Sequence, residues 1–225
     1  MFPPEVERDG NCCYTYLTSK EFPNPADFFH YSKKTRRVTQ VPALQNGDSI
    51  LGTELSWYDY HFHQPWDNEY RILGEDNFNG DDCLVIERVK SKIYPDFYMG
   101  KSVIWIERHN FLRLHEEQFD KEGKIFKIMD RKWKQLKPSN HWVLNSWNVI
   151  TLKTKARTLI QQFDYELDTG RREMDFDAIR MTEEKFWKKC ENGPPLINKL
   201  SDFPPAPEVR KQFWNNLGIS PEIVK

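Results

Sequence analysis

The chain has 225 residues, of which 33 are Lys or Arg and 34 are Asp or Glu, so its formal net charge is -1. This balance provides no broad basic surface for nucleic-acid phosphates, and we predict no nucleic-acid partner. Hydrophobic residues make up 38% and charged residues 30%, which is too apolar for a disordered chain and too polar for a membrane protein. Aromatic residues reach 14%, and such large rings can line a wide core or a cavity.

No apolar run approaches the roughly 20 residues that a transmembrane helix needs. The N-terminus, Met-Phe-Pro-Pro-Glu, lacks the charged-then-apolar pattern of a secretory signal, so we expect either a cytosolic protein or a mature or truncated form. No Gly/Ser linker divides the chain. We therefore predict one domain over residues 1–190 and a Pro-rich C-terminal tail with a short helix over residues 191–225.

The pattern along the chain is typical of successive β-strands separated by Gly, Asn, Asp and Pro. The first hairpin is predicted at residues 28–31 and 35–39. Residues 102–107 are apolar at consecutive positions, which indicates a central strand that is buried on both faces. Gly123 can supply the positive φ of a tight turn, and the remaining strands are predicted at residues 82–89, 112–119, 124–136 and 142–152.

The clearest alternation comes late in the chain, at residues 159–167 and 174–178, with a turn at Asp168-Thr169-Gly170. Strands joined by tight turns pair antiparallel, so the sequence predicts a mainly β (α+β) fold with one antiparallel sheet. Helices are expected only at residues 182–189 and 208–217, with Gly218 ending the second one. The tail is expected either to lie over the sheet or to serve as a segment that binds a partner.

Asp59, His61 and His63 form the best candidate for a metal site, because alternate residues of a strand point the same way. The simpler interpretation, which we favour, is a polar strand face with no metal. No motif of a nucleophile, a zinc protease or a phosphate-binding loop is present, and we expect no cofactor. Cys83 is most simply a small buried hydrophobic residue, and the pair Cys12-Cys13 is most simply incidental.

The order of several segments resembles the outer-membrane lipoprotein-sorting proteins, the LolA-like family. The segments are Phe28-Phe29-His30-Tyr31, Lys34-Thr35-Arg36-Arg37-Val38, Gly52-Thr53-Glu54-Leu55-Ser56-Trp57-Tyr58-Asp59, Tyr70-Arg71-Ile72-Leu73-Gly74, Val103-Ile104-Trp105-Ile106, Phe111-Leu112-Arg113-Leu114 and Phe119-Asp120-Lys121-Glu122-Gly123-Lys124 with Phe126-Lys127. The resemblance covers roughly residues 28 to 187 (the span of the segments above and the helix predicted after them).

This resemblance implies a strongly curved antiparallel sheet that forms an incomplete β-barrel with a few helices. It further implies a periplasmic carrier, not an enzyme, whose concave apolar face holds a lipid, a lipoprotein acyl chain or another hydrophobic ligand. An RND-type exporter or an outer-membrane acceptor is the implied partner. The family pattern brings no catalytic residue and no metal.

Aromatic residues are the predicted ligand contacts, and they are Trp57, Trp105, Phe119, Trp133, Trp142, Phe163, Tyr165 and Phe176. Two other functions stay open at this point. The first is a small-molecule hydrolase or lyase that uses Asp59, His61 and His63 in the same cavity. The second is an adaptor whose tail, residues 191–225, docks a membrane exporter and can be deleted without loss of the fold.

Overall fold

The computed structural model describes residues 10–16, 26–32, 35–41, 47, 49–50, 52–60, 66, 68–91, 98–162, 165, 167, 170 and 203–224. Within these ranges the protein is mostly β, with two short helices, α2 (Trp57–Tyr60) and α3 (Lys211–Asn216). No helix among these residues is both long enough and apolar enough to span a bilayer.

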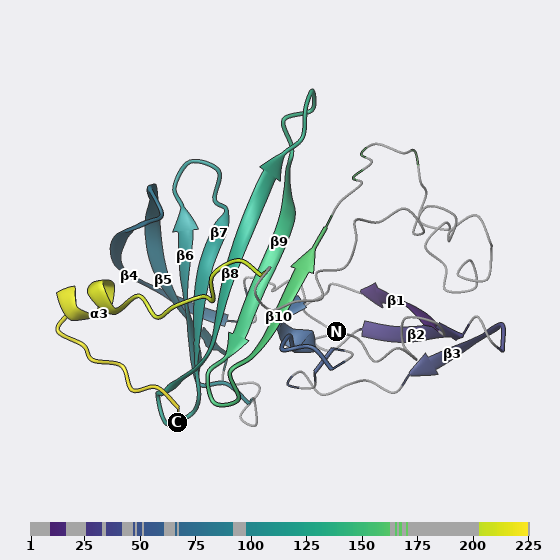
Figure 1. Ribbon diagram of the computed structural model, residues 1–225, viewed down its shortest axis with the longest axis horizontal. Coiled ribbons are helices and arrows are strands. Elements are labelled where there is room, and N and C mark those ends of the chain that lie inside the picture. The colour runs from purple at the N-terminus through teal and green to yellow at the C-terminus, as the bar shows by residue number, and fades with distance from the viewer. Residues whose placement is uncertain are drawn as a thin grey trace.

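A seven-stranded antiparallel sheet forms the body of the protein (Figure 1). The strand order is β10-β9-β8-β7-β6-β5-β4, so β4 and β10 are its edges and the sheet is not closed. This open sheet confirms the predicted fold class. Its strands are β4 (Asn68–Phe78), β5 (Asp81–Lys90), β6 (Lys101–Glu107), β7 (Arg113–Phe119), β8 (Ile125–Gln135), β9 (Trp142–Thr151) and β10 (Ala156–Gln161).

A second sheet of three strands precedes the large one in the chain. It contains β1 (Gly10–Tyr16), β2 (Ala26–Ser32) and β3 (Arg37–Val41), paired antiparallel in that order. The pairing of β2 with β3 confirms the hairpin predicted at residues 28–39. Strand β1 was not among the strands predicted from the sequence.

Tight turns join the strands of the large sheet where the sequence provides residues that accept a positive φ. Asn79 and Gly80 have φ angles of 56° and 100° and form a two-residue turn between β4 and β5. Gly123 has a φ of 82° in the turn between β7 and β8, as the sequence predicts. These turns fix the register of the pairs on either side.

Both faces of the large sheet carry a hydrophobic core. On one side, which we call the tail face, Val85, Val103 and Trp105 pack against the C-terminal segment of residues 203–224. On the other side, which we call the α2 face, Leu55 from the segment before α2 packs against Met129 and other side chains of β8 and β9. Central strands are therefore buried on both sides, as predicted for residues 102–107.

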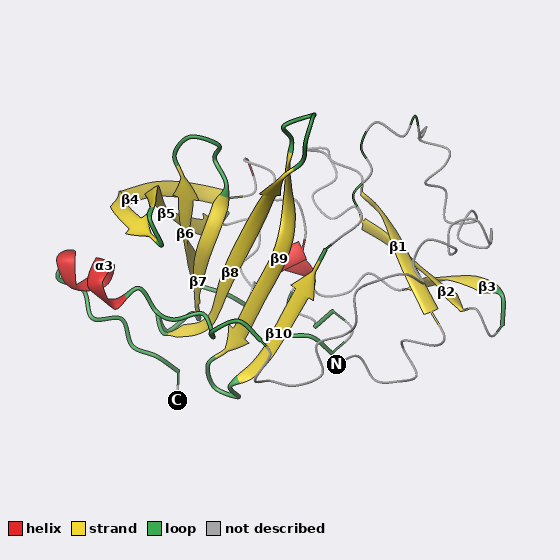
Figure 2. Ribbon diagram, turned by 45° about the horizontal axis from the view of Figure 1, so that its top comes forward, coloured by secondary structure: helices red, strands yellow, loops and turns green. Residues whose placement is uncertain are grey.

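The C-terminal segment runs across the tail face from β10 toward β4 and carries α3 (Figure 2). The α3 side chains Phe213 and Trp214 are buried in the tail-face core. Gly218, with a φ of 70°, follows the end of the helix, as predicted. The expectation that the tail lies over the sheet is thus confirmed for residues 203–224.

The late hairpin predicted at residues 159–167 and 174–178 is wrong in its first strand, because β10 begins at Ala156 and ends at Gln161. Tyr165 and Leu167 lie outside any strand. Among the described residues, the last backbone bond to β9 is the one that Gln162 N–H donates to the Asn145 carbonyl. The returning strand and the helix predicted at residues 182–189 lie outside the described residues.

Candidate functional site

The central strand β7 reads Arg-Leu-His-Glu-Glu-Gln-Phe, and six of its seven residues are buried. Alternate side chains of a strand point to opposite faces. His115 and Glu117 therefore lie on the tail face, whereas Glu116 and Gln118 lie on the α2 face. Charged side chains are almost never fully buried without partners, so each face must hold groups that compensate them.

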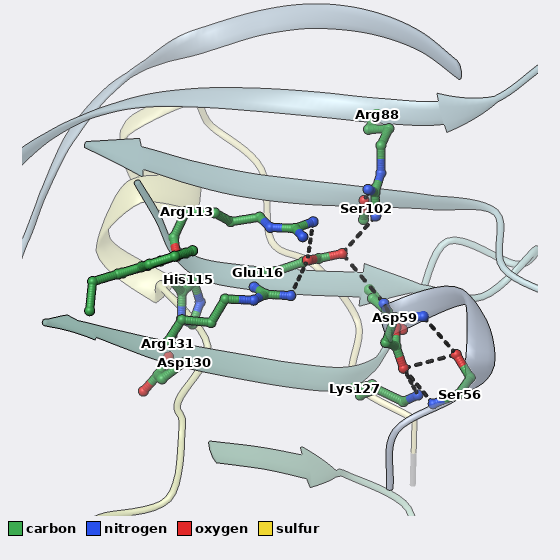
Figure 3. Close-up of polar contacts among 12 residues, drawn as sticks. Ser56, Asp59, Arg88, Ser102, Arg113, His115, Glu116, Lys127, Asp130 and Arg131 are labelled. Carbon is green, nitrogen blue, oxygen red and sulfur yellow. Dashed lines mark hydrogen bonds and ion pairs between the residues drawn. The ribbon is translucent and has the colours of Figure 1, made fainter. Parts of the chain in front are cut away.

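Glu116 is the centre of an arginine cluster on the α2 face (Figure 3). One carboxylate oxygen, Oε1, accepts from Arg88 Nη2 at 2.8 Å. The other, Oε2, accepts from Arg131 Nη2 at 3.1 Å and from Arg113 Nη1 at 3.3 Å. The Glu116, Arg88 and Arg131 side chains are buried, and the Arg113 side chain is 28% exposed.

The charges of this arginine cluster do not balance among the residues described. Three guanidinium groups, those of Arg88, Arg113 and Arg131, surround one carboxylate. Burial, reinforced by the charge of Arg113, lowers the pKa of Arg131 to about 9, which still leaves it protonated at neutral pH. Its Nη1 atom is buried and has no hydrogen-bond partner, and the same is true of Nε1 of Trp147, the residue directly opposite Arg131 on β9.

A second polar cluster lies beside the first and is balanced. Asp59 Oδ2 accepts from Lys127 Nζ at 2.9 Å and from Ser56 N and Oγ at 2.7 and 2.9 Å. Asp59 Oδ1 accepts from Gln118 Nε2 at 2.5 Å. Tyr98 OH lies 2.9 Å from Ser56 Oγ, and burial raises the pKa of Tyr98 well above its usual value. Because its carboxylate is fully engaged, Asp59 is a poorly placed general base.

An aliphatic patch borders the arginine cluster on the same face. Cross-strand partners share a face of the sheet, and the register joins Ile72 to Ile86, Ile86 to Ile104 and Ile104 to Glu116. In the neighbouring row, Ile106 lies between two partners, Leu84 on β5 and Arg113 on β7. The patch thus consists of Ile72, Leu84, Ile86, Ile104 and Ile106, and Ile72 at its edge is 64% exposed.

Polar groups of the tail face hold the C-terminal segment in place. Glu117 accepts from Arg210 N and from Trp214 Nε1, both at 2.6 Å. Asp76 Oδ2 accepts from Arg210 Nη2 at 2.9 Å and from Trp105 Nε1 at 2.8 Å. These bonds satisfy the buried carboxylate of Glu117 and the partly buried carboxylate of Asp76.

His115 lies beneath this segment, between carboxylates of two strands. Its Nδ1 is 2.6 Å from Asp130 Oδ1, and its Nε2 is 3.5 Å from Glu117 Oε1. Burial opposes protonation, but the hydrogen bond to Asp130 and the nearby carboxylate of Glu117 outweigh it and raise the pKa of His115. The nearest opening is a groove of about 440 Å³ between the sheet and the tail, lined by Asp130 and Arg210 among others. Its lining mixes polar residues with apolar ones such as Phe78 and Val209.

The predicted aromatic contacts that lie among the described residues do not gather at one site. Trp105 and Phe119 are buried on the tail face, where they pack edge to face against Phe213 and Trp214. Trp133 is partly buried beside the same core.

The remaining rings lie elsewhere. Trp142 is 38% exposed and donates to Asn110 Oδ1, and the Tyr165 hydroxyl donates to the Leu144 carbonyl. Trp57 is in α2, with its side chain outside the described part, and Phe163 and Phe176 are also outside it.

The strand proposed to align Asp59, His61 and His63 is wrong at its start, because Asp59 lies in α2. His61 and His63 are outside the described residues. Among the residues that are described, no three His, Cys, Asp or Glu side chains are grouped to hold a metal ion. Ser56 and Asp59 exchange hydrogen bonds as a helix-capping pair, and the spacing Ser-x-x-Asp is the sequence feature that could have revealed the helix.

Comparison with known proteins connects this chain to other sequences and folds. Residues 14–183 match the model of a family described as "Uncharacterized protein". The chain belongs to this family. No curated protein is similar enough in sequence to count as a relative.

Two solved structures of other proteins have a fold similar to that of this chain. A domain described as an outer membrane lipoprotein-sorting protein, from Vibrio parahaemolyticus, is 20% identical, with a TM-score of 0.63 over 79% of this chain and 80% of that one. A DUF1329 family protein from Desulfovibrio piger is 19% identical, with a TM-score of 0.65 over 78% of this chain and 71% of that one. The fold that the resemblance to lipoprotein-sorting proteins implies is thereby confirmed.

Proposed function

We propose that the protein is a periplasmic carrier that binds a lipid, a lipoprotein acyl chain or another hydrophobic ligand. The observation that carries this proposal is the open seven-stranded antiparallel sheet, shared with a domain described as an outer membrane lipoprotein-sorting protein. The function is transport within the cell envelope and includes no catalytic step. An RND-type exporter or an outer-membrane acceptor is the proposed partner.

The aliphatic patch on the α2 face supports the binding of a hydrophobic ligand. Ile72 is 64% exposed, and Leu84, Ile86 and Ile106 are only partly buried, so the sheet presents apolar surface that no described segment fully covers. Each methylene of an acyl chain that leaves water on such a surface contributes about 0.8 kcal/mol. A long chain can therefore be held without a charged contact. That the eight aromatic residues contact the ligand stays a prediction.

Native mass spectrometry of the gently purified protein, followed by titration with a fluorescent fatty acyl probe, tests the carrier function. We expect a mass above that of the bare chain, or saturable probe binding once the protein is delipidated. Ile72→Ser should weaken probe binding several-fold, whereas Ile219→Ser, at an exposed residue beyond α3, should not. A bare-chain mass together with no probe binding would refute the proposal.

A further inference from the structure

The arginine cluster and the aliphatic patch are adjacent parts of one surface. Ile104 is the cross-strand partner of Glu116, and Ile106 is the cross-strand partner of Arg113. The α2 face therefore changes from aliphatic to cationic between β6 and β7. Such a surface matches a molecule with an apolar chain at one end and a negative charge at the other.

We propose that this surface binds an amphipathic lipid whose acyl chain lies on the aliphatic patch and whose anionic oxygen accepts N–H groups of Arg113, Arg131 and Trp147. This inference rests on the proposed carrier function and specifies its ligand class. A fatty-acid carboxylate and a phospholipid phosphate share this chemistry, because each presents negatively charged oxygens to guanidinium donors.

The charge of the site carries the first part of the argument. A buried ion cluster that serves only the fold is expected to balance its charges, since an uncompensated buried charge costs several kcal/mol. Here Arg88, Arg113 and Arg131 face the carboxylate of Glu116, whereas the neighbouring pair of Lys127 and Asp59 is balanced. Among the residues described, the arginine cluster therefore has more positive than negative charge.

The second observation that supports the proposal is a pair of buried donors without partners. Buried donors are bonded in the great majority of cases, so an exception needs an explanation. Arg131 Nη1 and Trp147 Nε1 are both buried without an acceptor, and they belong to residues directly opposite each other on β8 and β9. The Arg131 guanidinium also lies 4.5 Å from the centre of the Trp147 ring. An oxygen anion entering here would satisfy donors that nothing in the described structure satisfies.

Access to the site comes through Arg113, whose side chain is 28% exposed while the other two arginines are buried. Arg113 begins β7 at the border of the patch, opposite Ile106. An anionic group that reaches Arg113 from solvent would place its chain along β6 and β5. Substitution of Arg113 is therefore the most direct test of the proposed site.

Equilibrium titration of the delipidated protein with oleate, lysophosphatidic acid and the uncharged monoolein tests the inference, with each probe below its micelle concentration. We expect oleate or lysophosphatidic acid to bind at least ten times more tightly than monoolein. A preference between the two anions identifies carboxylate or phosphate as the natural group. Arg113→Gln should reduce the preference for the anion to within about twofold.

Arg71→Gln is the matched control, because Arg71 is 70% exposed and pairs with Glu87, the cross-strand partner of Val103 on the tail face. It should keep the full preference. Trp147→Phe is the alternative variant if Arg113→Gln does not fold. It removes one donor but retains a ring, and it should weaken binding of the anionic probes more than binding of monoolein. Equal binding of anionic and neutral probes would overturn the assignment of the anionic group and leave the carrier function standing. Absence of binding by all probes would refute the carrier function itself.

Discussion

Replacing Glu116 by Gln removes the carboxylate that is bonded to the three arginines of the cluster while it preserves side-chain volume. In the folded protein Arg88, Arg113 and Arg131 donate to it at 2.8, 3.3 and 3.1 Å. For charge centres about 4 Å apart, each attraction is worth about 4 kcal/mol at an effective dielectric constant of about 20, before the desolvation cost is subtracted. Removing one partner of a buried ion pair destabilises proteins by about 3–5 kcal/mol, and we expect a loss in this range.

Urea denaturation followed by tryptophan fluorescence measures this loss as a change in the free energy of unfolding. The loss would be about a fifth or more of the about 5–15 kcal/mol that stabilises a typical domain. Glu75→Gln is the control, because Glu75 is 72% exposed and its pair with Arg108 should contribute less than about 1 kcal/mol. If both variants lost the same small amount, the cluster would be hydrated in solution and the argument from buried charge would be wrong.

Further predictions concern other parts of the sheet. Because the pKa of His115 is raised in the folded protein, its stabilising contribution is complete below about pH 6.5 and is lost as the pH rises through the folded pKa. The free energies of unfolding of the protein and of the His115→Gln variant should therefore converge with rising pH. Trp214→Ala should destabilise the fold by about 3–5 kcal/mol in urea. Burial raises the pKa of Cys83 to about 11, so the thiol should react with a maleimide only after unfolding. Gly100→Ala should lower the melting temperature, since the new Cβ would meet the Asp120 carbonyl oxygen.

The strands between residues 101 and 151 could be predicted because their signals are local. Residues 102–107 carry β-branched and aromatic side chains on both faces, and Gly123 accepts the φ that its turn requires. The alternation of residues 159–167 is equally regular, yet β10 ends at Gln161. Alternation specifies two faces, but a strand also needs a partner, and the sequence does not show where the neighbouring strand stops pairing.

The candidate site could not be predicted from the sequence, because its compensation comes from strands far apart in the chain. Glu116 and Glu117 are adjacent acidic residues, which normally indicates a solvent-exposed segment. Glu116 is instead paired with Arg88 and Arg131, and Glu117 with the backbone of Arg210. Of the arginine partners, only Arg113, three residues before Glu116, is local. Arg88, Arg131 and Arg210 are all more than ten residues from β7, so spacing alone gives no indication of them.

The C-terminal segment is also far along the chain from the strands that it contacts, which is why the sequence left its role open. Phe213 and Trp214 belong to the tail-face core, so deletion of residues 191–225 would remove core side chains as well as any partner segment. An adaptor whose tail is dispensable for folding does not fit this packing. Partner binding by the tail is better tested with changes at exposed residues, such as Ile219→Ser, than with a truncation.

The two faces of the sheet predict different responses to a bound lipid. If the ligand binds on the α2 face, oleate should slow hydrogen exchange of the amides of residues 84–88 and 104–106 and leave those of α3 unchanged. If it instead enters on the tail face, it must displace Phe213 and Trp214 from Trp105 and Phe119, and exchange in α3 should accelerate. The second result would make Trp105 and Phe119 ligand contacts, as the sequence predicts, and would contradict the placement of the anionic group at Arg113. Because Glu117 and Asp76 hold the tail through buried hydrogen bonds, we expect the first result.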